Sequence, residues 1–326
     1  MRKTLILLAC SILAAASFAN ERMKKNKDQL SREVVLVCDE VVPPFICEQP
    51  IFELGVALSG GGAHGFAHAG VLKAMEEVGI RANVVAGTSA GAIAGAMYAA
   101  GVTPEQMVEV FGSIRFFQIP KLHLFGRDNG VDSAQDRHDS YIRLKIQDLE
   151  KIVARALPVS RFEELQIPLV VNATDIARGS NVYFSTGELV RPIVASSAIP
   201  MFFKSVTINN VEYVDGGVIQ NLPVSALRQA CKYVIAVDVN PMEDFSNQSK
   251  MLEREWERVF RLMIRANTLK DKEQSDLFIQ PTQLVHYSIF DTKHGEEMFW
   301  IGYNHAKPIL EQFAKAHPEL VRQAAQ

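Results

Sequence analysis

The sequence predicts an α/β fold of three layers, in which helices cover both faces of a mainly parallel β-sheet. Apolar segments of strand length alternate with segments of helical periodicity, an order typical of parallel strands joined by helices. Residues 233–239 are predominantly apolar, as expected for a strand covered on both faces. The chain has 326 residues, of which 48% are hydrophobic, so it is long enough to bury one large core.

Two strand–turn–helix units open the predicted fold. Residues 52–58 are apolar and predict a buried strand. A glycine-rich turn follows, and residues 66–78 place their apolar side chains on one helical face before Gly79 ends the helix as a C-cap. A second strand at 83–86 then leads through a tight turn into a helix of small residues at 92–100.

The later elements are predicted from caps, apolar runs and helical periodicity. A helix begins at Thr103 and Pro104, because threonine is a favoured N-cap and proline a favoured first helical residue. The predicted strands that follow are 168–173, 190–195, 211–214, 233–239 and 277–280, and the predicted helices are 251–270 and 296–315.

The first residues are predicted to be a secretory signal peptide, residues 1–19. Arg2 and Lys3 precede an apolar run, and small residues stand before a cleavage position after Ala19. The run is shorter than the about 20 residues that a membrane span needs. We therefore expect export to the periplasm or beyond the cell.

Two further expectations concern the N-terminal third of the chain. The residues before Cys10 also resemble a lipoprotein cleavage box, but their apolar stretch is very short, so we favour cleavage after Ala19 over a lipid anchor. Residues 20–51 are then a leader that begins polar and charged, and residues 52–326 form one domain.

Charge argues against one class of partner. Removal of residues 1–19 would leave 32 basic and 37 acidic residues, a net charge of −5. General nucleic-acid binding favours a basic surface, so we expect no nucleic-acid partner.

The spacing of the cysteines and the residues that flank them predict their states. Cys38 and Cys47 lie close together in a chain predicted to be exported, and we expect them to form a disulfide. Cys231 stands in an apolar segment and is expected to be a buried thiol. The spacing of the cysteines resembles no zinc site, so no metal is predicted.

The sharpest chemical signal is Gly87-Thr88-Ser89-Ala90-Gly91, a G-x-S-x-G motif between a strand and a helix. This context predicts a nucleophile elbow, a strained turn that projects the serine at the carboxyl end of the sheet. The flanking glycines, Gly87 and Gly91, are needed because the turn is crowded. Ser89 is therefore the candidate nucleophile, although a glycine turn with an uninvolved serine is the alternative for this motif alone.

The second signal is Gly60-Gly61-Gly62-Ala63-His64-Gly65, which also follows a strand and opens a helix. Consecutive glycines let backbone N–H groups converge on an anion, as in an oxyanion hole. The same run matches the dinucleotide fingerprint, which requires an acidic residue at the end of the next strand. That strand ends in Gly87-Thr88-Ser89, which argues against dinucleotide binding.

The third signal is Asp215-Gly216-Gly217 after a strand, which in isolation is a plain turn. A Ser-His-Asp enzyme needs a histidine on a late loop. His286, His294 and His305 are late in the chain, and none has a context that singles it out. A triad with one of these histidines therefore stays open at this point.

Taken together in this order, the three motifs resemble the patatin-like phospholipase family. The resemblance extends from residue 52 to the last predicted helix. It includes Asn172-Ala173-Thr174-Asp175, the run from Ala195 to Pro200, and Gly302-Tyr303. The sequence departs from the family where His64 stands in place of the more usual arginine, and where Met201 follows Pro200 in place of glycine.

The resemblance implies a serine acyl hydrolase that uses no metal or cofactor. It implies Ser89 as nucleophile, Asp215 as its base without a histidine, and Gly60, Gly61 and Gly62 as the oxyanion hole. The implied substrates are acyl lipids, attacked as by a phospholipase A or a lysophospholipase with transient contact to a membrane surface. The alternatives are an ordinary Ser-His-Asp esterase and a lipid-binding protein with a degenerate site.

Residues 116–127 mix apolar, aromatic and basic side chains. They are interpreted either as a lid that contacts lipid or as a buried loop.

Overall fold

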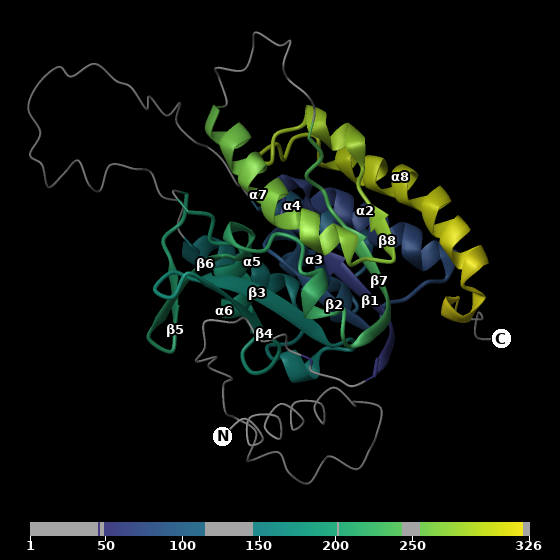
Figure 1. Cartoon of the computed structure of the whole chain (residues 1–326). Helices are drawn as coiled ribbons and strands as arrows, with labels where there is room; N and C mark the ends of the chain where they lie inside the picture. Colours follow the sequence, from purple (N-terminus) through teal and green to yellow (C-terminus); the bar gives the residue numbers. More distant parts are fainter. Residues whose placement is uncertain (1–44, 46–48, 115–145, 201, 243–254, 322–326) are drawn as a thin grey trace, which may run out of the picture.

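A computed structural model describes residues 45, 49–114, 146–200, 202–242 and 255–321 (Figure 1). The predicted signal peptide, the pair of Cys38 and Cys47, and the segment 116–127 lie outside these residues. Cys231 is buried, as predicted. In the described part of the chain, no helix combines the length and the hydropathy that a membrane span requires.

The centre of the fold is one mixed sheet of eight strands with the order β5-β6-β3-β2-β1-β7-β8, and β4 pairs with β3 beside this path. The five strands from β3 to β8 run parallel, whereas the pairs β3–β4, β3–β6 and β5–β6 are antiparallel. The strands are β1 (Phe52–Leu58), β2 (Val84–Gly87), β3 (Leu169–Asp175), β4 (Ser180–Phe184), β5 (Val206–Ile208), β6 (Val211–Asp215), β7 (Cys231–Val237) and β8 (Leu277–Ile279).

Seven α-helices lie in the described residues, and they give the sheet two covered faces. They are α2 (Gly65–Val78), α3 (Ala90–Ala99), α4 (Pro104–Ser113), α5 (Ile146–Ala156), α6 (Val190–Ser196), α7 (Glu255–Glu273) and α8 (Gly295–Ala316). The larger core cluster packs α2 to α6 and α8 against Val56, Val171 and Val237 of the sheet. The other face is covered by the segment 222–230, with α7 beyond it. The predicted three-layer α/β fold is confirmed.

Helices α2 and α8 lie side by side along the first face (Figure 1). Their backbones touch at two glycines. A Cβ on Gly70 would lie 2.8 Å from the Tyr303 nitrogen, and one on Gly302 would lie 2.8 Å from the Ala67 Cα. This close approach requires glycine at both positions, since a side chain there would force the two helices apart.

One predicted element is wrong. Residues 190–195 were expected to be a strand, and they form helix α6 instead. A short apolar run does not by itself separate a buried strand from a buried helix. Pro192 is the third residue of α6, in the first turn, where its missing N–H costs no helical hydrogen bond. The position beside β3 that an additional strand would occupy is taken by β4 and β6.

Candidate active site

Ser89 lies in a strained turn between β2 and α3. Its backbone angles are φ 53° and ψ −119°, in a region that serine rarely adopts and that the predicted nucleophile elbow requires. The Ser89 N–H donates to the Ser196 hydroxyl of α6 at 2.9 Å. The strained conformation is therefore held from outside the turn, at the positive end of the α3 dipole.

The flanking glycines are required by contacts with neighbouring backbone. A Cβ on Gly87 would lie 2.6 Å from the Gly91 carbonyl carbon, and a Cβ on Gly91 would lie 2.5 Å from the Ser59 carbonyl oxygen. Real Cβ atoms do not approach this closely. Both glycines thus let the elbow fold back against the end of β1.

Asp215 is the last residue of β6 and reaches Ser89 from the antiparallel part of the sheet. It pairs with Ala173 of β3, and its backbone N–H donates to the Ala198 carbonyl at 3.0 Å. The Ser89 side chain hydrogen-bonds to the Asp215 carboxylate, and the Gly217 N–H donates to the same carboxylate at 2.7 Å. Two residues that are 126 positions apart in the sequence are thereby brought into direct contact.

Burial changes the chemistry of this carboxylate. Desolvation disfavours the charged form and raises the pKa of Asp215 to about 7, even though hydrogen bonds from Ser89 and Gly217 act in the opposite direction. A carboxylate with a pKa near neutrality is a far stronger base than an exposed aspartate, whose pKa lies near 3.8.

The glycine run lies directly against Ser89. A Cβ on Gly60 would lie 3.2 Å from the Ser89 Cβ and 2.5 Å from the Asn221 Oδ1. The Gly60 N–H donates to the Asn221 carbonyl at 3.1 Å, and the Ala63 N–H donates to the Ile289 carbonyl at 2.7 Å. The amides of Gly61 and Gly62 lie between these two fixed points, where the loop has the left-handed backbone of Gly62 (φ 58°).

His64, at the position where the resemblance leads us to expect arginine, is a buried support of this loop. Its Nδ1 lies 2.7 Å from the Val239 carbonyl oxygen and its Nε2 lies 3.2 Å from the Tyr287 carbonyl oxygen. Burial, reinforced by the charge of Arg261, lowers the pKa of His64 to about 4. The ring is therefore neutral at pH 7 and donates only one hydrogen bond, which the shorter distance assigns to Val239.

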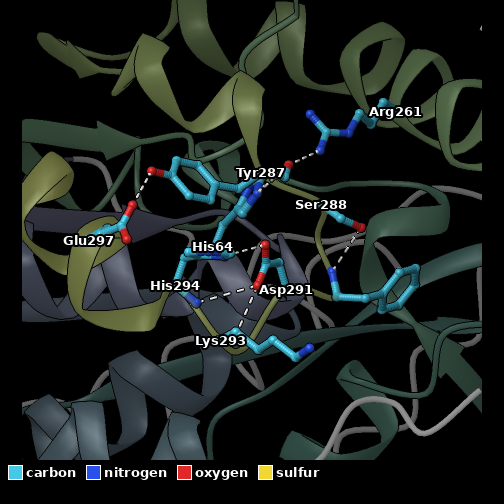
Figure 2. A network of polar contacts seen from close by, with 9 residues as sticks. His64, Arg261, Tyr287, Ser288, Asp291, Lys293, His294 and Glu297 are labelled. Carbon is cyan, nitrogen blue, oxygen red and sulfur yellow. Dashed lines mark hydrogen bonds and ion pairs between the residues drawn. The ribbon is translucent and has the colours of Figure 1, made fainter. Parts of the chain in front are cut away.

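An arginine does approach this place from another element. Arg261 of α7 donates to the Tyr287 carbonyl at 2.7 Å, so that carbonyl faces both the histidine and the guanidinium (Figure 2). With histidine at position 64, the glycine loop is supported by the His64 imidazole, while the Arg261 guanidinium of α7 contacts the same Tyr287 carbonyl.

A buried polar network behind Ser89 and Asp215 connects the two halves of the site. The Thr88 hydroxyl donates to the Asn172 side chain, and Asn172 Nδ2 donates to the Gln220 carbonyl at 2.8 Å. The Gln220 amide group in turn donates to Asp271 of α7 at 3.0 Å, and accepts from Asn181 at 2.8 Å. The neighbour of the nucleophile and the turn after Asp215 are therefore fixed to one set of side chains.

The late histidines occupy other positions. His294 lies at the surface with its Nδ1 2.7 Å from Asp291, as Figure 2 shows. His286 is exposed in the segment before it, and His305 is partly buried in α8. The Ser89 hydroxyl is directed at Asp215, so the geometry favours a dyad over a triad with these histidines.

Several site residues were not identified from the sequence. The Asn221 side chain lies between the glycine run and the aspartate turn. Its Oδ1 would lie 2.5 Å from a Cβ on Gly60 and 2.8 Å from a Cβ on Gly217. Ser196, Gln220 and Asp271 act through tertiary contacts. In the sequence, Asn172 and Ser196 stand out only as members of motifs that carry the resemblance, and no pattern predicts a role for Asp271. Among the described residues, no three histidine, cysteine or acidic side chains group as metal ligands.

Comparison with known proteins identifies the family. The profile described as patatin-like phospholipase matches residues 56–228, which is more than half of the chain. The chain belongs to the patatin-like phospholipase family, as the order of its motifs predicted.

Two curated relatives illustrate the similarity at the level of sequence. Lysophospholipase NTE1 of Kluyveromyces lactis is 25% identical over 288 residues, which cover 79% of this chain and 19% of the relative. Lysophospholipase NTE1 of Mycosarcoma maydis is 32% identical over 198 residues, which cover 59% of this chain and 10% of the relative. The chain thus spans less than a fifth of the length of these relatives.

Solved structures of bacterial proteins are also similar, at lower sequence identity than these relatives. VipD from Legionella pneumophila has a TM-score of 0.45 and 17% identity, over 81% of this chain and 67% of VipD. ExoU from the type III secretion system of Pseudomonas aeruginosa, solved with SpcU, has a TM-score of 0.37 and 15% identity, over 84% of this chain and 54% of its own.

Proposed function

We propose that this chain is a serine acyl hydrolase that cleaves fatty-acyl esters of phospholipids and lysophospholipids through the dyad of Ser89 and Asp215. One observation carries the proposal. A serine in a strained elbow hydrogen-bonds to a buried carboxylate whose pKa is about 7, directly beside a run of three glycines. Family membership and the lysophospholipase relatives support an acyl lipid as the substrate.

The proposed reaction begins with attack of the Ser89 Oγ on the ester carbonyl carbon. Asp215 takes the hydroxyl proton as the new C–O bond forms. The tetrahedral oxyanion is stabilised at the run Gly60, Gly61 and Gly62. Because the Gly60 N–H already donates to the Asn221 carbonyl, we assign the two donors to Gly61 and Gly62.

Collapse of this intermediate releases the alcohol and leaves an acyl-enzyme. The alcohol is the lysolipid or the glycerophospho compound, and it leaves with the proton that Asp215 held. A water molecule then attacks the acyl carbon while Asp215 takes its proton. As the bond between the acyl carbon and the Ser89 Oγ breaks, Asp215 returns the proton to Oγ, so the fatty acid is released and the free enzyme is restored. Water is the only reactant that this sequence needs besides the lipid ester.

A panel of phospholipids, lysophospholipids and short soluble esters tests this function, with products identified by mass spectrometry. We expect free fatty acid from at least one glycerolipid class, and no product from Ser89→Ala. Fatty acid release that is unchanged in Ser89→Ala, or an absence of ester cleavage across the whole panel, would contradict the proposal.

The Ser-His-Asp esterase remains the second candidate because the pair of Asp291 and His294 resembles the acid–histidine half of a triad. Its distinguishing property is dependence on that histidine. Export after cleavage at Ala19 stays a prediction, and the mass of the N-terminal peptide of the mature protein tests it.

A further inference from the structure

Helix α7 exposes more large hydrophobic side chains than any other described element. Seven large hydrophobic side chains are exposed in the described part of the chain, and four of them lie on α7: Val259 (59% exposed), Leu262 (48%), Met263 (39%) and Leu269 (52%). Surface helices ordinarily turn such residues toward the core. The unusual feature is therefore the concentration of exposed apolar side chains on one helix.

These four side chains form one stripe, which we call the outer stripe of α7. Successive residues of a helix are rotated by about 100°, so positions 259, 262, 263 and 269 fall within about one third of its circumference. Ala266, which is also exposed, fills the gap in the stripe between Met263 and Leu269. The stripe is thus a continuous apolar surface over about three turns of helix.

The opposite side of α7 buries polar groups and uses them to hold the catalytic region. Arg261, Thr268 and Asp271 are buried there, with Ile264 as the buried aliphatic residue among them. Asn267 Nδ2 donates to the Gly217 carbonyl at 2.9 Å. Its Oδ1 accepts from the Asn221 N–H at 3.0 Å.

This arrangement puts the outer stripe and the aspartate turn on two sides of the same helix. An α-helix with its side chains is about 10–12 Å across. A surface that contacts the outer stripe therefore lies roughly one helix diameter from the turn that carries Asp215.

We propose that the outer stripe of α7 docks the protein on the surface of its lipid substrate, by inserting Val259, Leu262, Met263 and Leu269 among the lipid chains. The proposal rests on the proposed lipid hydrolase function. Long-chain lipids are presented at an apolar–aqueous boundary, so the enzyme has to work at such a surface. The stripe supplies an apolar face of matching chemistry, and the opposite side of the same helix holds the turn that carries Asp215.

The charges around the stripe fit a phospholipid surface. Arg265 is exposed on α7 beside the stripe, and Lys270 is exposed at its C-terminal end, directly after Leu269. At both places a basic side chain reaches the phosphate level while its stem stays in apolar contact. The whole chain nevertheless has a net charge of −3. Docking is therefore driven by apolar insertion, and it occurs on zwitterionic phosphatidylcholine vesicles with weak dependence on salt.

The test compares vesicle binding of two matched variants. The first carries Leu262→Gln, Met263→Gln and Leu269→Gln, because glutamine keeps helix propensity while removing apolar contact. The control carries Ile176→Gln and Trp300→Gln, which change exposed apolar residues on other elements (48% and 45% exposed). Both are made with Ser89→Ala and sedimented with phosphatidylcholine vesicles, so that hydrolysis does not alter the surface.

We expect the affinity for vesicles to fall roughly 10-fold for each of the three replaced side chains, and so about 1000-fold for the triple variant. The control keeps its affinity. With Ser89 restored, the triple variant loses hydrolysis of vesicle lipid to a similar extent, and it hydrolyses a short soluble ester within about twofold of the parent rate.

Three results would overturn the docking. The first is equal vesicle binding by the parent and the triple variant. The second is loss of a dimer in the triple variant with vesicle binding unchanged, which would assign the stripe to a second copy. The third is a fall in Tm with vesicle binding unchanged, which would assign it to packing within the chain. If no ester is cleaved but the triple variant still abolishes binding, docking stands and the hydrolase proposal fails.

Discussion

Asp215→Asn is expected to abolish activity and at the same time to stabilise the protein. The substitution keeps the shape of the side chain. Its Oδ1 still accepts from the Gly217 N–H, and its Nδ2 can donate to Ser89. What it removes is a negative charge buried against the nucleophile, and with it the base.

The size of the stabilisation follows from the pKa of Asp215. Folding raises it from 3.8 to about 7, so the unfolded chain gives up its proton more readily than the folded one. Each pKa unit corresponds to about 1.4 kcal/mol, and the ionised group at pH 8 therefore lowers the free energy of unfolding by about 4 kcal/mol. The stability associated with the protonated form is fully present below about pH 4 and is lost as the pH rises to about 7.

Urea unfolding of the wild type and of Asp215→Asn between pH 4 and pH 8.5 measures this difference directly. We expect the free-energy advantage of the variant to grow across this range to at most about 4 kcal/mol and then to level off, while hydrolysis falls by about 10²–10⁴-fold. An advantage that does not change with pH would show that Asp215 does not titrate near 7, and the reasoning would be wrong.

Three further predictions use the same site. The value of kcat/KM should rise with pH to a plateau, with a midpoint near pH 7, because Asp215 must be ionised to act as a base; a flat profile from pH 5 to pH 9 would contradict this. Gly91→Ala should lower the free energy of unfolding by about 1–3 kcal/mol or more, because its Cβ would meet backbone, whereas Gly112→Ala, with nothing within 4 Å of the new Cβ, should not destabilise the fold in urea. His286→Ala and His294→Ala should each keep most of the esterase activity, and a loss as large as that of Asp215→Asn in either one would favour the triad.

The sequence was informative where backbone geometry demands particular residues. The glycines at 87 and 91 are needed by contacts with neighbouring backbone, and this demand leaves a mark in the sequence. The same holds for Gly60 and Gly217, which adjoin Ser89 and Asp215. Alternation of apolar strands and amphipathic helices was likewise sufficient to predict the three-layer fold.

Tertiary contacts determine the features of the structure that the sequence pattern does not predict. Residues 190–195 are apolar enough for a strand, and only the occupied position beside β3 makes them helix α6. Asp271 is one of four acidic residues in α7, and its contact with Gln220 arises from the packing of α7 on the segment 216–230. The polar inner side of that helix likewise follows from what it packs against.

The nucleophile assignment is tested most directly by the reaction of the protein with a fluorophosphonate probe, followed by peptide mapping. We expect a single adduct on the peptide that contains Ser89, no adduct in Ser89→Ala, and labelling slowed by at least about 100-fold in Asp215→Asn. An adduct that persists in Ser89→Ala, or labelling of Asp215→Asn at the wild-type rate, would contradict the dyad.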